Sequence, residues 1–268
     1  RRVPPVPPVA PHELSMPAFL RAIRSNALTM WSGAAYTQDV VVRRFFGRTN
    51  VLVNAPEAIH RVLVDNPTNY RRSPASIRIL RPITGDGLLL SDGESWRHQR
   101  RTIAPALAPR VMPMLARHIV AVTQERLPAI AAQAAQGPLD LLATMQALTL
   151  EIAGRSMFSL EMAAFGPALR RLLTEYAERF SQPLLLDMLL PASVPTLRDL
   201  RRRWFQARWM RLIETIMRDR LRGPQPETPR DLFDLLRAAR DPETGEAFSP
   251  AQLRDQLATL LLAGHETT

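Results

Sequence analysis

The chain ends in a helical stretch whose residue types could do chemistry. The segment LLLAGHETT passes from apolar helix-forming residues into Gly264, Glu266 and Thr267 without a turn signal. A glycine inside a helix opens a notch, and a threonine one turn later can bond a carbonyl oxygen four residues back or offer its hydroxyl group to a molecule in the notch. An adjoining acid would suit this site to proton delivery. Each residue alone is more typical of helix packing or of a solvated surface, so the interpretation depends on their combination.

The start of this helix determines which of its residues share a face. Ser249 and Gln252 have the spacing of a capping box, and Pro250 occupies the first helical position. At about 100° per residue from that start, the glycine and one threonine lie on the apolar stripe, which we expect to face the core. The stripe consists of Leu253, Leu257, Leu260, Gly264 and Thr267.

A second stretch, SDGESWRHQRR, predicts another capped helix with Ser91 as its N-cap. Trp96 and Arg100 are four residues apart and share a face of this helix. An indole N–H and a guanidinium group that point the same way form a site for a buried or half-buried anion such as a carboxylate. The alternative is that Trp96 is a core anchor and Arg100 is exposed by chance. Arg97 and Arg101 form a second pair, which points elsewhere and is expected to be solvated.

The composition is that of a globular protein with a sizeable core, since 46% of the residues are hydrophobic and 22% are charged. The net charge of +10 comes from arginines that are spread among acidic residues, so we expect no nucleic-acid partner. No apolar run approaches the roughly 20 residues of a transmembrane helix, and the opening RRVPPVPPVAP lacks the apolar centre of a signal peptide. We therefore expect a cytoplasmic protein. The absence of cysteine excludes thiolate metal ligands from these residues.

The elements around these motifs are expected to be almost all helical. Residues 1–12 form a proline-rich arm, and a helix follows over residues 13–31. The segments VVVRRFFG and NVLVN predict two short strands joined by a tight turn. The expected fold class is thus mostly α with a small N-terminal β-sheet. Further helices are expected near residues 92–107, 109–135, 138–160, 166–182, 196–222, 230–239 and 249–268.

Together the two motifs resemble a known family. WRHQRR and AGHETT are similar to the third long helix and the central helix of the cytochrome P-450 haem-thiolate monooxygenases, in the order and at the approximate interval that the family shows. FFGRTNVLVNAPEAIHRVL resembles the family's first strand pair and the helix that follows it. LEIAGRSMF and DLLRAARDPETGEAFSPAQLRDQLATLLLAGHETT are similar to later segments. The resemblance covers nearly the whole chain after the proline-rich arm, and it implies a P-450-like fold.

The resemblance implies haem, an iron protoporphyrin, as the cofactor. Carried over to this sequence, it implies that Trp96 and Arg100 hold a haem propionate, which is an anion of the predicted kind. It also implies that Ala263 and Gly264 line the oxygen pocket, where the missing side chain leaves room.

The same resemblance implies the catalytic residues and the activity. Thr267 would hydrogen-bond to dioxygen or to water in the oxygen pocket, and Glu266 would supply protons from outside. The full-length enzyme would insert one oxygen atom from O2 into a small apolar substrate. Its electrons would come from NAD(P)H through a ferredoxin or flavodoxin-type partner.

One feature of the family is missing from this sequence. The family's iron is held by a cysteine thiolate, and these residues include neither a cysteine nor another metal ligand that the resemblance implies. We therefore expect residues 13–268 to be the N-terminal part of a single haem monooxygenase domain, ending inside the central helix. The fragment alone is expected to be inactive.

The substrate pocket is expected to involve the segment after NYRRSP, and core packing is the alternative. The apolar segment between Pro183 and Pro191 is a candidate lid or entrance. The residues expected in the pocket wall are Ile77, Ile79, Leu80 and Leu88.

Two alternatives belong to other functional classes. HETT could begin the H-E-x-x-H motif of a zinc metalloprotease, with His265 as a ligand and Glu266 as the base. The arginine-rich segment from Leu197 to Gly223 could bind nucleic acid or a membrane. Its apolar stripe argues instead for a packed helix with arginines on the solvated side. That stripe consists of Phe205, Trp209, Leu212 and Ile216.

Overall fold

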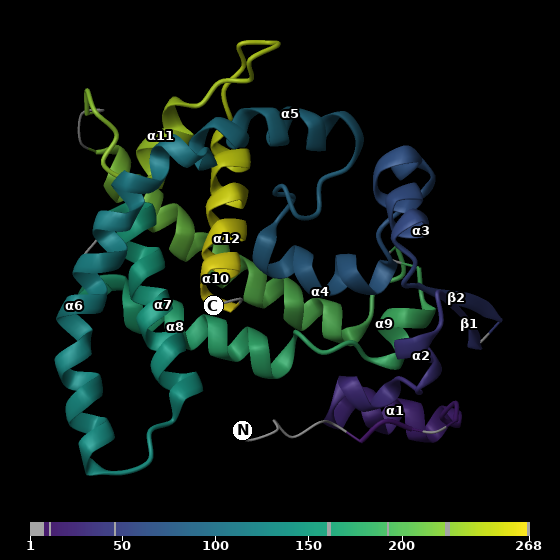
Figure 1. The fold of residues 1–268 in the computed structure, drawn as a ribbon. Coiled ribbons are helices and arrows are strands. Elements are labelled where there is room, and N and C mark those ends of the chain that lie inside the picture. Colours follow the sequence, from purple (N-terminus) through teal and green to yellow (C-terminus); the bar gives the residue numbers. More distant parts are fainter. Residues whose placement is uncertain are drawn as a thin grey trace. The chain divides into compact units, whose positions relative to one another are not determined.

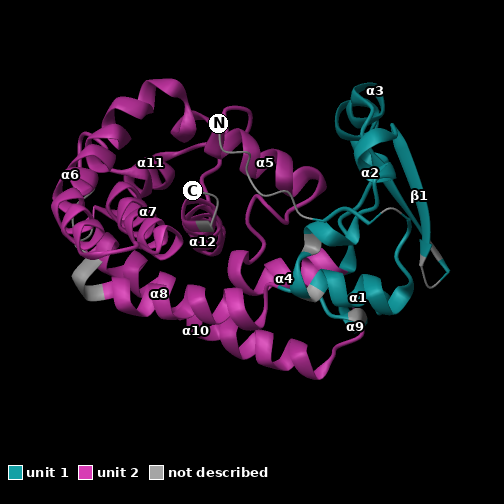
Figure 2. Cartoon of the chain, turned by 60° about the horizontal axis from the view of Figure 1, so that its bottom comes forward, with its two compact units in different colours: residues 1–74, 182–191 teal, residues 75–181, 192–268 magenta. Residues whose placement is uncertain are grey.

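The computed structural model describes residues 8–10, 12–45, 47–159, 162–191, 193–222 and 226–266. The chain forms two compact units, which are described separately (Figure 2). The first unit comprises residues 1–74 and 182–191, and the second comprises residues 75–181 and 192–268. That residues 13–268 belong to one functional domain stays a prediction. Most of the arm at residues 1–12 lies outside the described residues.

The first unit contains the small sheet. Strands β1 and β2 form an antiparallel hairpin with Val40 opposite Val53, which confirms the predicted strand pair. The turn passes through Gly47, whose φ of 73° suits glycine. The unit consists of α1 (Met16–Ser25), a 3-10 turn (Ala27–Met30), α2 (Ala34–Thr37), β1 (Val40–Phe45), β2 (Arg48–Val53), α3 (Pro56–His60), helical turns at Arg61–Asp65 and Pro67–Asn69, and α9 (Leu185–Leu189).

The single helix expected over residues 13–31 is wrong. The helix α1 ends at Ser25 because Asn26 is extended and its side chain accepts a hydrogen bond from the backbone N–H of Leu28 at 3.1 Å. This bond starts a separate 3-10 turn, as asparagine side chains commonly do. Arg43 also ties this region to the hairpin, since it is buried and donates to the carbonyl oxygen of Met30 at 3.2 Å.

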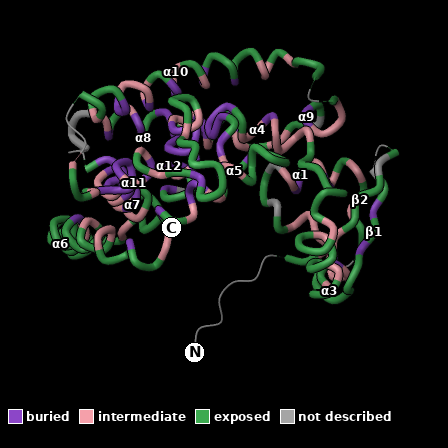
Figure 3. Tube along the Cα trace, turned by 90° about the horizontal axis from the view of Figure 1, so that it is seen from above, coloured by how far each residue is buried: buried purple, intermediate pink, exposed green. Residues whose placement is uncertain are grey.

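The regular elements of the second unit are helices among its described residues, and an isolated antiparallel bridge joins Arg240 to Ala247. Trp209 is fully buried at its centre, and its indole N–H donates to the carbonyl oxygen of Ile83 at 2.7 Å. The buried segments gather where α7, α8, α10, α11 and α12 meet, whereas α6 is exposed along most of its length (Figure 3). The helices are α4 (Pro74–Thr84), α5 (Gly93–Ile103), α6 (Met112–Gln136), α7 (Leu141–Phe158), α8 (Met162–Arg179), α10 (Leu197–Leu221), α11 (Leu232–Ala238) and α12 (Pro250–Glu266).

The mostly helical fold with a small N-terminal sheet is confirmed, and the helix boundaries agree with prediction to within a few residues at most ends. The helix expected over residues 92–107 ends earlier, at Ile103, and a 3-10 turn (Ala104–Leu107) replaces its last turn. Pro105 lies in the first turn of that segment, where a proline cannot continue the backbone hydrogen bonds of α5.

Helix α10 packs as a core helix, but the expectation that its arginines coat a solvated side is wrong in part. Arg202 is only 1% exposed and pairs with Asp199 at 3.1 Å. Arg220 pairs with the buried Asp231 at 2.7 Å. A buried arginine needs a carboxylate partner, because an unpaired charge is costly to remove from water.

None of the helices within the described residues is long and apolar enough to cross a membrane.

Candidate functional site

Helix α12 starts as the sequence predicted. The backbone N–H of Ser249 donates to the Gln252 side chain at 2.9 Å, and the backbone N–H of Gln252 donates to the Ser249 hydroxyl group at 3.2 Å. The capping box is thereby confirmed, and it satisfies two donors at the helix start. The helix then packs against α7, α10 and α11 (Figure 1).

The middle of α12 is held by polar side chains that bond the loop between α4 and α5. The Asp255 carboxylate accepts from the backbone N–H of Asp86 at 2.9 Å. The side-chain amide oxygen of Gln256 accepts a hydrogen bond from the backbone N–H of Leu88 at 3.1 Å. Both side chains are buried and bonded, so the polar groups impose little of the penalty that unpaired buried groups carry.

This loop approaches α12 closely because two of its residues are glycines. A Cβ atom on Gly85 would lie 2.4 Å from the Asp255 carboxyl carbon. A Cβ atom on Gly87 would lie 2.4 Å from the Thr259 hydroxyl oxygen and 2.7 Å from the backbone oxygen of Asp255. These distances exclude any side chain at either position unless the loop or the helix moves.

The last turns of α12 differ from the expected arrangement. Leu261 and His265 are buried, but Ala263 and Gly264 are exposed. The expectation that Gly264 faces the core is therefore wrong. The buried face of these turns is rotated toward α7 and α11. Among the described residues, a Cβ atom on Gly264 would meet Ala153 of α7 alone, at an ordinary 3.6 Å.

The exposed residues of α12 continue the face that bonds α5. Residues four, seven and eight positions after Gln256 share its side of a helix. These are Leu260, which is half-buried, and the exposed Ala263 and Gly264; we call these three residues the α12 ledge. Thr267 lies outside the described residues, and Glu266 ends the helix with its side chain outside them.

Helix α5 begins one residue later than the sequence predicted. Its N-cap is Asp92, whose side chain accepts from the backbone N–H of Gly93 at 2.8 Å. Ser91 is buried in the preceding turn, where its backbone N–H donates to the Gly87 carbonyl oxygen at 2.9 Å. The expected N-cap at Ser91 is thus wrong, because that residue belongs to the tight turn against α12.

In α5, the residue that contacts α12 is buried, whereas the two candidate propionate donors are exposed. Gln99 is 2% exposed and accepts a hydrogen bond from the Gln256 side chain at 2.5 Å. Trp96 is 41% exposed, and Arg100 is exposed as well. Trp96 is therefore not the core anchor of the alternative interpretation. Trp96 and Arg100 lie close together round α5, on one side of the face that carries Gln99.

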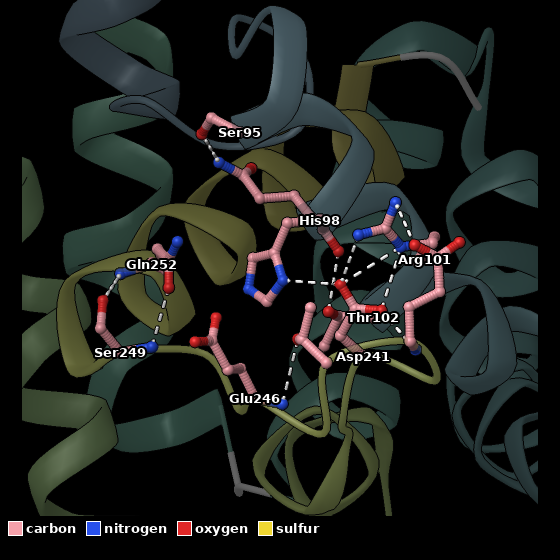
Figure 4. A network of polar contacts seen from close by, with 11 residues as sticks. Ser95, His98, Arg101, Thr102, Asp241, Glu246, Ser249 and Gln252 are labelled. Carbon is pink, nitrogen blue, oxygen red and sulfur yellow. Dashed lines mark hydrogen bonds and ion pairs between the residues drawn. The ribbon is translucent and has the colours of Figure 1, made fainter.

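The second arginine pair of α5 is not simply solvated. Arg97 is exposed and pairs with Glu94. Arg101, in contrast, donates from Nε at 3.0 Å and from Nη2 at 2.9 Å to the carboxylate of Asp241, whose side chain is fully buried (Figure 4). The expected solvated role of Arg101 is wrong. Its hydrogen bonds hold the pKa of Asp241 well below the ordinary value, and they raise the pKa of Arg101.

The comparisons with known proteins decide the family. The cytochrome P450 family model matches residues 4–268. The chain belongs to the cytochrome P450 family. It is 29% identical over 261 residues to cyclooctatin synthase of Streptomyces melanosporofaciens, covering 97% of this chain and 56% of that protein. Cyclooctat-9-en-7-ol 5-monooxygenase of the same organism is 29% identical over 86% of this chain and 49% of that protein.

Solved structures agree with a P450-like fold. The crystal structure of the cytochrome P450DA haem domain matches with a TM-score of 0.72 and 25% identity, over 97% of this chain and 57% of that one. The structure of a further cytochrome P450 matches with a TM-score of 0.68 at 23% identity. The chain spans about half the length of the curated relatives it matches.

The described residues fit haem, the cofactor of this P450 family. A flat apolar ring system suits the α12 ledge, where Ala263 and Gly264 present almost no side chain on an exposed face. A charged propionate suits Trp96 and Arg100, because an exposed indole N–H and a guanidinium group can both donate to a carboxylate. The sequence contains no cysteine, so the thiolate ligand is not among these residues.

The predicted pocket residues divide into two groups. Ile79 and Leu88 are half-buried and pack against the apolar core, which favours the core-packing alternative for both. Ile77 and Leu80 of α4 are also half-buried, and their role in a pocket stays a prediction. The segment at residues 183–191 contains the short helix α9, and Leu184 and Leu186 are exposed there.

A groove of about 900 Å³ lies elsewhere, between α7, α8 and α10, and includes Trp204 and Arg208. None of its lining residues belongs to α4, α5 or α12, so it is separate from the candidate haem site.

No group of three or more His, Asp or Glu side chains in the described part of the chain could hold a metal ion. The P450 assignment replaces the zinc-protease and nucleic-acid alternatives.

Proposed function

We propose that the full-length protein is a haem-dependent monooxygenase that inserts one oxygen atom from O2 into an apolar organic substrate. The observation that carries the proposal is the α12 ledge, which continues the helix face that is bonded to α5 through Gln256 and Gln99. Helix α5 also carries the exposed donors Trp96 and Arg100. Two further observations support it. The chain is a cytochrome P450, and one relative carries the name of a monooxygenase.

Bound haem would supply the redox chemistry that activates O2. The residues of this chain would bind the haem and the substrate and orient them. Trp96 and Arg100 would hold a propionate by charge-assisted hydrogen bonds, and Ala263 and Gly264 would keep the space above the ring free of side chains. Ile77 and Leu80 would contribute apolar surface for the substrate.

Thr267 and Glu266 would handle protons. Thr267 follows Leu260 by seven positions in the sequence, the spacing of residues that share a helix face, so we propose that it continues the face of the ledge. A hydroxyl group there can accept a proton on one side and donate one on the other, and the Glu266 carboxylate can replenish it from solvent.

Electrons would come from NAD(P)H through a redox partner. A ferredoxin or flavodoxin-type protein is our first proposal, and a reductase is the other candidate, because a Bacillus subtilis relative, 26% identical to this chain, is named as a bifunctional cytochrome P450/NADPH–P450 reductase. Arg97 keeps an exposed guanidinium group that could attract an acidic partner, whereas Arg101 is engaged by Asp241. We propose the cytoplasm as the compartment, since NAD(P)H is available there.

The test is the substitution Thr267→Ala in the full-length enzyme. We expect the variant to bind substrate and accept electrons, because the pocket keeps its walls. Product formed per electron should fall at least about tenfold, and hydrogen peroxide should rise in its place, since removing a positioned proton donor commonly costs 10²–10⁴-fold.

Thr268→Ala is the matched control, because consecutive residues of a helix are about 100° apart and Thr268 is therefore not expected to share the face proposed for Thr267. The measurement is the ratio of product to hydrogen peroxide for both variants and for the parent enzyme. Unchanged coupling in Thr267→Ala, or a larger loss in Thr268→Ala, would contradict the assignment of Thr267 as a catalytic residue.

A further inference from the structure

A buried carboxylate joins α5 to the loop that leads into α12. Asp241 lies between α11 and α12, and its side chain has no exposed surface. Arg101 binds both of its oxygen atoms, and the ring nitrogen Nδ1 of His98 lies 2.9 Å from Oδ2 (Figure 4). The remaining capacity of Oδ1 is used by the backbone N–H of Glu243, at 2.9 Å. The carboxylate is therefore bonded on every side by groups that donate to it.

The loop that carries this carboxylate is itself closed. The backbone N–H of Asp241 donates to the carbonyl oxygen of Glu246 at 2.8 Å, and that of Gly245 donates back to Asp241 at 2.8 Å. The Glu243 carboxylate adds an exposed ion pair to Arg101 at 3.1 Å. The loop ends at Ser249, the N-cap of α12 (Figure 4). Its position is thus tied to the start of the central helix.

These contacts attach α5 at a second point. Gln99 bonds α12 from one face of the helix, and His98 and Arg101 bond Asp241 from another. A helix held on one face can roll about that contact, but attachments on two faces fix its rotation. The rotation determines where Trp96 and Arg100 point, because they lie across the helix from the Asp241 contact.

We propose that Asp241 is a positioning residue for haem binding, which fixes the rotation of α5 that directs Arg100 toward a propionate. The inference depends on the proposed function, since it needs Arg100 to contact the cofactor. Asp241 itself would touch neither haem nor substrate. Its contribution would pass entirely through Arg101, His98 and the helix that carries them.

The experiment is a double-mutant cycle in the full-length protein. Apoproteins of the parent, Asp241→Asn, Arg100→Leu and the double variant are titrated with haem, and the dissociation constant is read from absorbance. We expect Arg100→Leu to weaken binding about 10- to 100-fold, the cost of a hydrogen bond to a charged group. Asp241→Asn should weaken it about tenfold, as loss of an outer partner of a ligand does.

The decisive result is the double variant. If Asp241 acts through Arg100, Asp241→Asn should change haem affinity much less in the Arg100→Leu background than in the parent, because only Trp96 is left for the rotation of α5 to orient. In the Arg97→Leu background it should keep its tenfold effect, since Arg97 points elsewhere. A loss that is the same in both backgrounds reflects general loosening of the fold and overturns the inference.

Two further variants separate the remaining outcomes. Glu151→Gln also breaks two arginine contacts, one from Arg126 of α6 and one from Arg155 of α7 itself, and neither arginine belongs to α5. It should leave haem affinity unchanged. Arg101→Lys replaces Asp241→Asn in the cycle if that variant does not fold. Lysine keeps the positive charge but loses the bidentate hydrogen bonding of the guanidinium group. If Arg100→Leu alone has no effect, the propionate site of the proposed function is wrong. If Arg100→Leu weakens haem binding but the effects of Arg100→Leu and Asp241→Asn simply add, the propionate site stands and only the proposed role of Asp241 is wrong.

Discussion

The two halves of α12 are built for different purposes. In its first half the side chains of Asp255, Gln256 and Thr259 are buried, and they bond α4, the loop after it and α5. Its second half presents Ala263 and Gly264 on an exposed face. The same helix thus passes from tight polar attachment to an open ledge within about two turns.

This difference shows how a helix can combine fixed position with free space. Polar side chains that bond a partner's backbone determine rotation and register more sharply than apolar contacts, which tolerate sliding. Once Gln256 fixes the rotation, the positions of Leu260, Ala263 and Gly264 follow from the helical period. The second half can therefore leave one face uncovered and still hold it in a defined direction.

The strongest test of the attached half is Gly87→Ala. The new Cβ atom would lie 2.7 Å from the backbone oxygen of Asp255, so the loop or α12 must move. We expect a loss of about 3 kcal/mol in the free energy of unfolding, at the upper end for overpacking. The measurement is urea unfolding of the full-length apoprotein.

Gly33→Ala is the control for this substitution. Gly33 has helical backbone angles, and a Cβ atom there would find its nearest neighbour, Val9, at 4.0 Å. Its free energy of unfolding should change by less than about 0.5 kcal/mol. Equal losses in the free energy of unfolding at the two glycines would contradict the close approach of the loop to α12.

A smaller loss is expected for Gln256→Leu. The leucine fills similar space but leaves the backbone N–H of Leu88 and the side-chain oxygen of Gln99 without their present partner. An unsatisfied buried donor costs about 1–3 kcal/mol, so we expect a loss of about 2 kcal/mol on unfolding. Leu260→Met, one turn further along the same face, should cost less than about 1.5 kcal/mol. A neutral Gln256→Leu would remove the distinction between the two halves.

Residue identity made part of this site predictable. The capping box at Ser249, the strand pair and the spacing of Trp96 and Arg100 depend on local chemistry, which the sequence states directly. The resemblance of AGHETT to the P450 central helix depends on the same kind of information. Contacts within a few residues need no knowledge of the tertiary structure.

The contacts that fix the site were not predictable in this way. The direction of Gly264 depends on how α12 is rotated against α7, and that rotation follows from bonds between Gln256 and residues more than 150 positions earlier in the chain. Asp241 lies in the segment RDPETGEAF, which indicates a turn but gives no sign that its acid is buried against Arg101. Ser91 and Asp92 are both good N-caps, and only the turn against α12 decides between them.

The last prediction concerns Gly264→Ala, which separates stability from function on the open half. A Cβ atom at this position would meet Ala153 at 3.6 Å, an ordinary contact, and alanine is the better helix former. The free energy of unfolding of the apoprotein should therefore stay unchanged or rise by up to about 1 kcal/mol. Product formation by the full-length enzyme should nevertheless fall, because the added methyl group occupies the ledge on which haem and O2 are proposed to meet. Urea unfolding and product turnover are measured on the same preparation. A loss of stability above about 1 kcal/mol would show that Gly264 is packed rather than exposed, and unchanged turnover would show that the ledge does not line the oxygen pocket.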